Sequence, residues 1–452
     1  MRDLTKGAPG KQIFIFALPM LLGNVFQQLY NIVDTIIIGR YIGTNALAAA
    51  GASFPVIFVL ISLVVGITTG TTIIISQYYG AKDYEKVKRA IDTAFIILFF
   101  GSIILTILGL VFIGPIWRLL ALPEHLVADA TLYFNIFAMG LILMFGYNGV
   151  SAVLRGLGDS KTPLYFLIIA TILNIFLDLL FVLVFKWGIA GVAIATVVAQ
   201  GISFGLSVIY LNRYHQLIRV SYSGLVFDRD IFRKSLRIGI PTGLQHTFVS
   251  LGMMALLRIV NGFGTNTIAA YTIAGRIDSF AALPAMNFSM ALSTFVGQNL
   301  GANKPERVRE GLRKTMGMTT IISLAVTVAA WLFGREMMRV FTPDPEVIEI
   351  GYEYLVIVSS FYVLFSGMFT INGVMRGAGD TLIPMFITLF SLWIFRIPGS
   401  YLLSLKMGTN GIWWGIPLAW FFGWLFSYIY YKSGRWRSKV VVKYADNQPM
   451  KK

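Results

Sequence analysis

Two carboxylates, Asp34 and Asp178, stand inside stretches of this sequence that are otherwise suited to the hydrocarbon core of a bilayer. A charged residue at the centre of a membrane-spanning helix costs roughly 2.5–3.5 kcal/mol on insertion scales, so such residues usually face a cavity and a partner. Asn174 lies four residues before Asp178 and therefore shares its face of a helix. The three side chains offer hard oxygen ligands, which suit Na⁺ or a bound proton.

Thr196 and Tyr133 are expected at the same depth, because each lies a few residues inside a segment that enters the membrane from the outside. We predict that the five side chains converge on one cation in the N-terminal half of the chain. The competing interpretation is that Asn174 and Asp178 are separate polar residues that bond to neighbouring helices near the surface.

The identity of the cation stays open at this point. Two carboxylates at one depth with little water cannot both ionise freely, because desolvation and mutual repulsion favour a proton on at least one of them. A bound Na⁺ relieves the same repulsion. The pair can therefore hold either ion.

The elements that must position these residues are membrane-spanning helices. Of the 452 residues, 56% are hydrophobic and 13% charged, whereas about 25% of the residues of a soluble protein are charged. Apolar stretches of about twenty residues recur, each long enough to cross a bilayer as a helix. We predict an all-α polytopic membrane protein whose first segment is retained rather than cleaved. The twelve predicted spans are 13–38, 53–79, 91–113, 130–154, 163–185, 190–211, 236–260, 277–299, 315–334, 351–375, 382–405 and 411–431.

The absence of cysteine excludes disulfides and thiolate metal sites, and the three histidines are scattered along the chain. The net charge is +16. With the N-terminus inside, most of the 37 Lys and Arg residues fall on the cytoplasmic side, as positive-inside topology requires. We therefore predict a multi-pass plasma-membrane protein with both termini in the cytoplasm. Nucleic acid is not an expected partner, because topology accounts for the charge.

The chain repeats itself. Three pairs of similar segments are each separated by the same offset of 221 residues. The offset defines two six-span halves, 1–222 and 223–452, the second ending in a basic tail. Because six is even, we predict two parallel six-helix bundles related by a pseudo-two-fold axis along the membrane normal. Transporters of this kind hold substrate between the halves near the midplane. The repeated pairs are GTNALAAA from 43 with GTNTIAAY from 264, SQYYGAKDYEKVKRA from 76 with GQNLGANKPERVREG from 297, and VSAVLRGLGDSKTP from 150 with INGVMRGAGDTLIP from 371.

Two motifs occur once in each half. Q-x-x-G-A begins at Gln77 and Gln298, and R-G-x-G-D begins at Arg155 and Arg376. We interpret both as structural: the Arg and Asp pair with each other or with helix ends, and the glutamines cap helices or tie loops together. On the basis of these motifs and of Pro19 in the first span, the whole chain resembles the multidrug and toxic compound extrusion (MATE) family. Within that family it resembles the prokaryotic DinF-like branch.

The resemblance implies a V-shaped pair of six-helix bundles and cation-driven export of amphipathic, often cationic compounds. It also implies a bend of the first span at Pro19. The residues that the resemblance implies for the Na⁺ or proton site are Asp34, Asn174, Asp178 and Thr196, with Tyr133 as a neighbour in their network.

A matching cation site is not expected in the second half. At the offset of the repeat, the positions that correspond to Asp34, Asn174 and Asp178 carry Ala255, Phe395 and Gly399. We find no acid inside the seventh or tenth span, where some branches of the family carry one. Duplication is therefore expected to have kept the fold and left coupling in one half.

A promiscuous substrate cavity suits adaptable methionine and aromatic side chains. Arg396 is a remaining charge inside a span, and it either lines this cavity or extends along its stem to the outer interface. The other candidates for the cavity are Gln27, Tyr30, Asn31, Asn148, Met286, Asn287 and Met290.

We expect a secondary antiporter that exports drug-like organic compounds in exchange for H⁺ or Na⁺ by alternating access. The sequence has no ATP-binding loop of the G-x-x-x-x-G-K-[ST] type. The expected partners are small organic substrates and the lipid bilayer, with no cofactor and a monomer as the working unit. The alternative is a flippase for lipids or lipid-linked sugars with the same doubled bundle. A membrane-embedded enzyme and a passive channel rank below it, because the sequence shows neither a catalytic constellation nor a pore motif.

Overall fold

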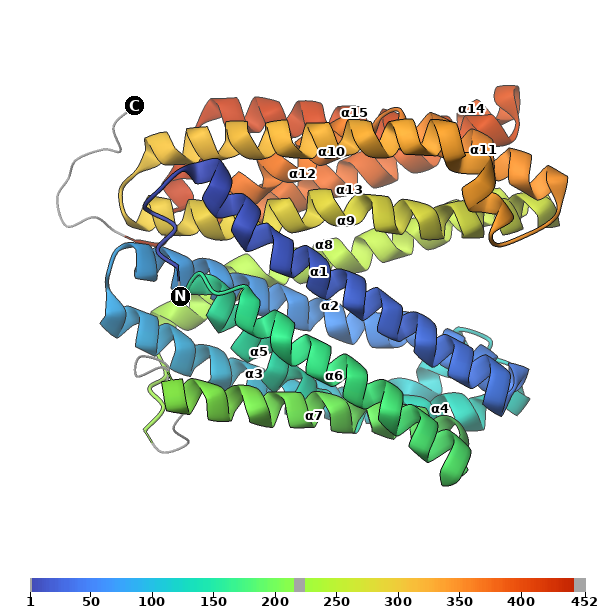
Figure 1. The fold of residues 1–452 in the computed structure, drawn as a ribbon, viewed down its shortest axis with the longest axis horizontal. Helices are drawn as coiled ribbons and strands as arrows, with labels where there is room; N and C mark the ends of the chain where they lie inside the picture. Colours follow the sequence, from blue (N-terminus) through green and yellow to red (C-terminus); the bar gives the residue numbers. More distant parts are fainter. Residues whose placement is uncertain (1, 215–223, 443–452) are drawn as a thin grey trace. The chain divides into compact units, whose positions relative to one another are not determined.

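The computed structural model describes residues 2–214 and 224–442, and within these ranges every regular element is helical. Figure 1 shows long helices running side by side within each part of the chain. The prediction of an all-α polytopic protein is confirmed. The α-helices are α1 (Pro9–Ile37), α2 (Thr44–Gly80), α3 (Tyr84–Leu119), α4 (Glu124–Met139), α5 (Leu141–Gly156), α6 (Lys161–Leu179), α7 (Gly188–Tyr214), α8 (Arg229–Asn261), α9 (Thr265–Gly301), α10 (Pro305–Arg339), α11 (Pro345–Ser359), α12 (Tyr362–Gly377), α13 (Leu382–Phe390), α14 (Ile397–Met407) and α15 (Thr409–Ser433).

The described helices account for the twelve predicted spans. Ten helical stretches are long and apolar enough to cross a membrane, and two bent helix pairs bring the number to as many as 12. The pairs are α4 with α5, bent by 47°, and α11 with α12, bent by 49°. Three spans contain short π-helices: η1 (Ile38–Ile42) follows α1, η2 (Leu180–Val184) follows α6, and η4 (Ser391–Arg396) joins α13 to α14.

The chain forms two compact units. One consists of Met1–Asp3 with Leu22–Gly243, and the other of Leu4–Leu21 with Leu244–Lys452. The predicted boundary between 222 and 223 lies outside the described residues. The first unit contains the buried cluster around Phe134, Phe137 and Trp117, and the second contains clusters around Phe295 and around Trp413. The beginnings of α1 and of α8 thus belong to different units from their ends.

The sequence repeat extends to the backbone conformation of the turns. Lys82 and Asn303 both have a left-handed φ, of 60° and 55°. Gly158 and Gly379 do so as well, with φ of 85° and 93°. A side chain at such a φ is strained, which explains why glycine occupies the latter two positions. The two halves therefore end corresponding helices in the same way.

The R-G-x-G-D motif ends one helix and begins the next. The Asp159 amide donates to Leu154 O at 2.8 Å around the left-handed Gly158, and this closes the end of α5. Asp159 Oδ1 then accepts hydrogen bonds from the amides of Lys161 and Thr162, each at 3.0 Å, at the start of α6. For Asp159 the predicted role at helix ends is confirmed, and its form is helix capping by the carboxylate.

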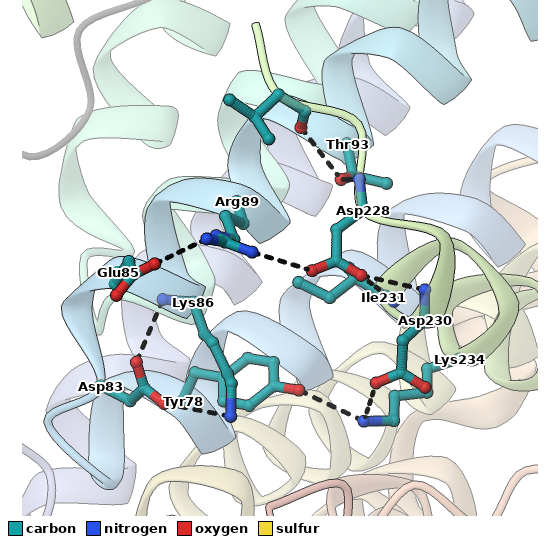
Figure 2. A network of polar contacts seen from close by, with 11 residues as sticks. Tyr78, Asp83, Glu85, Lys86, Arg89, Thr93, Asp228, Asp230, Ile231 and Lys234 are labelled. Carbon is teal, nitrogen blue, oxygen red and sulfur yellow. Dashed lines mark hydrogen bonds and ion pairs between the residues drawn. The ribbon is translucent and has the colours of Figure 1, made fainter.

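The start of α8 is held by α3 within the first unit (Figure 2). Asp228 Oδ1 accepts the amides of Asp230 and Ile231 at 2.9 and 3.0 Å, so Asp228 caps the helix. Thr93 Oγ1 accepts the Asp228 amide at 3.0 Å, and Arg89 lies 3.9 Å from Asp228 Oδ2. The same residue therefore begins α8 and ties it to α3.

The residues before α1 are held in a similar way within the second unit. Gln298 Oε1 accepts the Leu4 amide at 3.0 Å, and Asn299 Nδ2 donates to Leu4 O at 3.2 Å. Arg307 donates to Gly7 O at 2.9 Å. The predicted role of Gln298 in tying segments together is confirmed.

Candidate functional site

Two helices of the first unit bring Asp34 and Asp178 together. Asp34 lies three residues before the end of α1, and Asp178 lies one residue before the end of α6. Their exposed fractions are 9% and 0%. The two carboxyl groups are close enough to interact directly with each other. The structure thus converts two residues that are far apart in the sequence into one acidic pair.

The oxygens of the pair lack donors. Asp34 Oδ1 and both carboxylate oxygens of Asp178 are buried and accept no hydrogen bond from the described residues. Asn174 Oδ1 is buried without a partner among them as well. A buried acceptor without a donor is costly, and native proteins usually satisfy such groups with a bound ion, water or proton. The four oxygens form an acceptor-only cluster that a cation would complete.

Thr196 and two tyrosines enclose this acidic pair. Asn174 Nδ2 donates to Thr196 Oγ1 at 3.4 Å, and Thr196 Oγ1 donates to Val192 O at 3.1 Å, within its own helix α7. Tyr133 on α4 interacts electrostatically with both carboxyl groups. Tyr30, one turn before Asp34 on α1, interacts electrostatically with the same carboxyl groups and lines a small pocket together with Thr196. The structure therefore brings all five predicted coupling residues together and adds Tyr30, which we had placed in the substrate cavity.

A small pocket lies beside the acidic pair in the first unit. It has about 10 Å³ of space for the centre of a water molecule, which is close to the minimum that one water needs. The pocket is lined by Gln27, Tyr30, Leu167, Ala170, Thr171, Asn174, Thr196, Ala199 and Gln200.

Two polar residues of the pocket were missed by the sequence analysis, Thr171 and Gln200. Gln200 Oε1 is buried and has no partner among the described residues, so it adds a further acceptor. Gln200 follows Thr196 by four residues and Thr171 precedes Asn174 by three. Residues three and four apart share a helix face, and this spacing was the signal that could have found both.

The other cavity candidates in the first unit do not line this pocket. Asn31 is exposed and donates from Nδ2 to Gln28 Oε1 at 3.5 Å. Asn148 is half-buried and donates to Met144 O of its own helix at 2.8 Å. Both side chains are used locally on their own helices.

The remaining candidates belong to the second unit. Asn287 is fully buried on α9 and donates to Leu283 O at 2.8 Å, whereas Met290 is 39% exposed. Met286 is half-buried on the same helix.

Pro19 lies inside helix α1, which continues through it from Pro9 to Ile37.

One intramembrane acid, Asp278, was missed by the sequence analysis. Asp278 falls at the beginning of the predicted span 277–299, but α9 begins at Thr265, so Asp278 lies well inside the helix. It accepts hydrogen bonds from two tyrosines and interacts electrostatically with Arg396. The difference arises because residues 265–276 are too polar to extend an apolar window, although they continue the same helix.

Short π-helices follow both carboxylates of the pair: η1 begins four residues after Asp34, and η2 begins two residues after Asp178. The two π-helices contact each other, and both contact α7. π-helical turns are rare in proteins and are frequent at functional sites.

Comparison with known proteins places the chain in a family. The MatE family model matches residues 19–180 and again residues 241–402. Probable multidrug resistance protein YpnP of Bacillus subtilis is 35% identical over 437 residues, with 96% of this chain and 98% of that protein covered. Probable multidrug resistance protein NorM of Thermotoga maritima is 29% identical, with 96% and 94% covered.

Solved structures share the fold. A crystal structure of MATE in the straight conformation superimposes with a TM-score of 0.91 at 24% identity, covering 97% of this chain and 98% of that one. An outward-facing multidrug resistance MATE transporter of the MOP superfamily gives a TM-score of 0.90, also at 24% identity, with 96% and 98% covered. The doubled family match and the full-length relatives show that this multi-pass membrane protein belongs to the MatE family of multidrug efflux transporters.

Proposed function

We propose that this protein is an antiporter that exports amphipathic, often cationic organic compounds in exchange for H⁺ or Na⁺. The observation that carries the proposal is the set of buried oxygens on Asp34, Asn174 and Asp178 that find no donor among the described residues. We further propose that it acts as a monomer in the plasma membrane, with both termini in the cytoplasm.

The donor set fits a monovalent cation. Two carboxylates, an amide oxygen and the Thr196 hydroxyl are hard oxygen ligands of the type that Na⁺ prefers. A proton would fit differently, because a single proton shared by Asp34 and Asp178 would provide one donor and remove one negative charge. Either ion supplies what the acidic pair lacks.

The position of the pair explains how ion binding could be coupled to export. Asp34 and Asp178 stand on α1 and α6, so an ion that binds both carboxylates also fixes the contact between these helices. A ligand shifts a conformational equilibrium only by its difference in affinity between two states. Alternating access would follow if only one state brings the two carboxylates together.

The relatives support export of organic compounds and leave the range of compounds open. YpnP and the Thermotoga maritima NorM both carry the name of probable multidrug resistance proteins. Another, 25% identical over 420 residues, is an FAD transporter of Shewanella oneidensis. A cargo panel for this protein should therefore include organic cations and an organic anion.

The test is efflux from proteoliposomes under an imposed ΔpH and, separately, an imposed ΔNa⁺. We expect one gradient to drive efflux, and we expect Asp34→Asn and Asp178→Asn each to reduce it to background. The change keeps the side-chain volume, and the lost charge should weaken ion binding about 10- to 100-fold.

The matched control is Glu124→Gln, which removes an exposed carboxylate at the start of α4 in the same unit. This variant should export at the wild-type rate. Wild-type efflux by either Asn variant under both gradients would place the coupling site elsewhere.

A further inference from the structure

Asp278 is a further intramembrane carboxylate, in the unit formed by Leu4–Leu21 and Leu244–Lys452. It lies thirteen residues after Thr265 on α9, which places it about 20 Å along the helix axis. An ionisable residue at such a place usually faces the bundle interior or a water-filled path, and it marks a functional site. Asp278 has no place in the coupling site described above.

Two tyrosines orient the Asp278 carboxylate. Tyr362 on α12 donates to Oδ1 at 2.6 Å, and Tyr354 on α11 donates to Oδ2 at 3.5 Å. Each carboxylate oxygen can accept about two hydrogen bonds, so Asp278 retains the capacity for a further donor. The residue is half-buried rather than enclosed. The carboxylate is therefore held in position and is still able to take a ligand.

Arg396 is the countercharge of Asp278 but forms no ion pair with it. Arg396 ends the π-helix η4 and attracts Asp278 through space, with no hydrogen bond between the two side chains. Its buried Nε has no partner among the described residues. A pair that served only to brace helices would be expected to form a hydrogen-bonded ion pair, because an unpaired buried donor is destabilising. Arg396 is a countercharge that leaves the carboxylate oxygens free of its own donors.

The two tyrosines that donate to the carboxylate pack against further aromatic rings. Trp413 is fully buried, stacks on Tyr271 with ring centroids 5.7 Å apart, and meets the edge of Tyr354 at 5.1 Å. Tyr362 lies 6.0 Å from the ring of Trp420. Aromatic faces attract organic cations through their negative quadrupole. A carboxylate held by two tyrosines in an aromatic cluster is a combination suited to a positively charged, partly apolar group.

The repeat points to the same location. Tyr354 is the repeat partner of Tyr133, and Tyr133 faces the acidic pair of the first unit. Each half thus places the corresponding tyrosine beside an intramembrane carboxylate. The carboxylates come from different helices, α1 and α6 in one unit and α9 in the other. The sequence offset alone could not reveal this correspondence, because Asp278 is not the repeat partner of Asp34 or Asp178.

We propose that Asp278 anchors the positive group of exported organic cations, with Tyr354 and Tyr362 as positioning residues and Arg396 as the countercharge that the cation displaces. The inference rests on the proposed export function and names its cationic subsite. It predicts opposite effects from the two charged residues. Loss of Asp278 removes the attraction, whereas loss of Arg396 removes the competitor.

The test is equilibrium binding of tetraphenylphosphonium to the purified full-length protein in detergent, without any ion gradient. We expect Asp278→Asn to weaken binding about tenfold and Arg396→Gln to strengthen it severalfold. Triphenylphosphine oxide, a neutral molecule with three of the same rings, should bind both variants as it binds the wild type. Glu349→Gln removes an exposed acid of α11 in the same unit and is the matched control.

Unchanged tetraphenylphosphonium binding by Asp278→Asn would overturn the proposal. So would a parallel loss of both ligands in both variants, which is what a merely structural pair would produce. If Asp278→Asn does not fold, Arg396→Gln decides alone, since only a competing countercharge predicts tighter cation binding. Normal gradient-driven efflux by Asp34→Asn would count against the coupling site and leave this binding result unaffected.

Discussion

At the scale of single residues, the structure separates carboxylates that cap helices from carboxylates that lack donors. Asp159 accepts two backbone amides and the Thr162 hydroxyl, the latter at 2.7 Å. Its repeat partner Asp380 is 3% exposed and accepts the Tyr430 hydroxyl at 2.6 Å. In contrast, Asp178 is fully buried and accepts no hydrogen bond from the described residues. Asp159 and Asp380 thus find hydrogen-bond donors within the protein. The carboxylate of Asp178 retains its full capacity to bind a ligand.

A residue-scale prediction follows for the capping carboxylate of Asp159. Asp159→Ala should lower the apparent melting temperature in detergent, because loss of an N-terminal cap typically costs about 1 kcal/mol. Asp159→Asn should cost less, since an amide oxygen can still accept the backbone amides. Neither variant should change the ion that drives efflux. Altered ion dependence in a well-folded Asp159 variant would contradict the structural role.

At the scale of elements, the beginnings of α1 and α8 are anchored through specific hydrogen bonds. Asp228 caps α8 and is tied to Thr93 and Arg89 of α3 (Figure 2). Leu4 is tied to Gln298 and Asn299 of α9. Each anchored segment lies in a different unit from the far end of its own helix. Each of these two helices therefore contributes residues to both units.

An element-scale prediction concerns the start of α8. Asp228→Ala should lower the apparent melting temperature, because it removes the acceptor of two backbone amides and the partner of Arg89. The expected loss is about 1–2 kcal/mol. Asp230→Ala in the same helix is the control, because its 71%-exposed side chain makes only a surface ion pair with Lys234, worth about 0–1 kcal/mol. Equal destabilisation by both changes would argue against the capping role.

At the scale of the whole molecule, the distribution of charge predicts the orientation in the membrane. Basic residues should gather on the cytoplasmic side, with both termini inside. The absence of cysteine makes this directly testable, because an introduced cysteine would be the only thiol in the chain. Suitable positions are His125 and Ser438, both of which are exposed.

The whole-molecule prediction is that a membrane-impermeant maleimide labels His125→Cys in intact cells and labels Ser438→Cys only after lysis. His125 lies at the turn that begins α4, and Ser438 follows the last long helix, α15. Retained efflux by both variants would show that the labelled proteins are folded. The reverse labelling pattern would invert the predicted topology.

The sequence by itself determined the class of fold and the repeat. Apolar length, helical periodicity and the position of turn glycines are local properties, and they sufficed for the spans and for the doubled turns at Gly158 and Gly379. Depth along a helix also follows from position in the sequence, because each residue advances the helix by a constant rise. This is why Asp34, Asn174, Asp178 and Thr196 could be expected at one level before any helix was placed.

Only the tertiary structure decided which faces meet at that level. Tyr30 and Gln200 join the acidic pair and its pocket because of how α1 and α7 are rotated against α6, and no local pattern fixes that rotation. Asp278 shows the same limit more strongly: its partners Tyr354, Tyr362 and Arg396 come from three other elements. Packing of side chains far apart in the sequence sets these contacts, and it places an acid that the sequence analysis missed at the centre of a polar cluster.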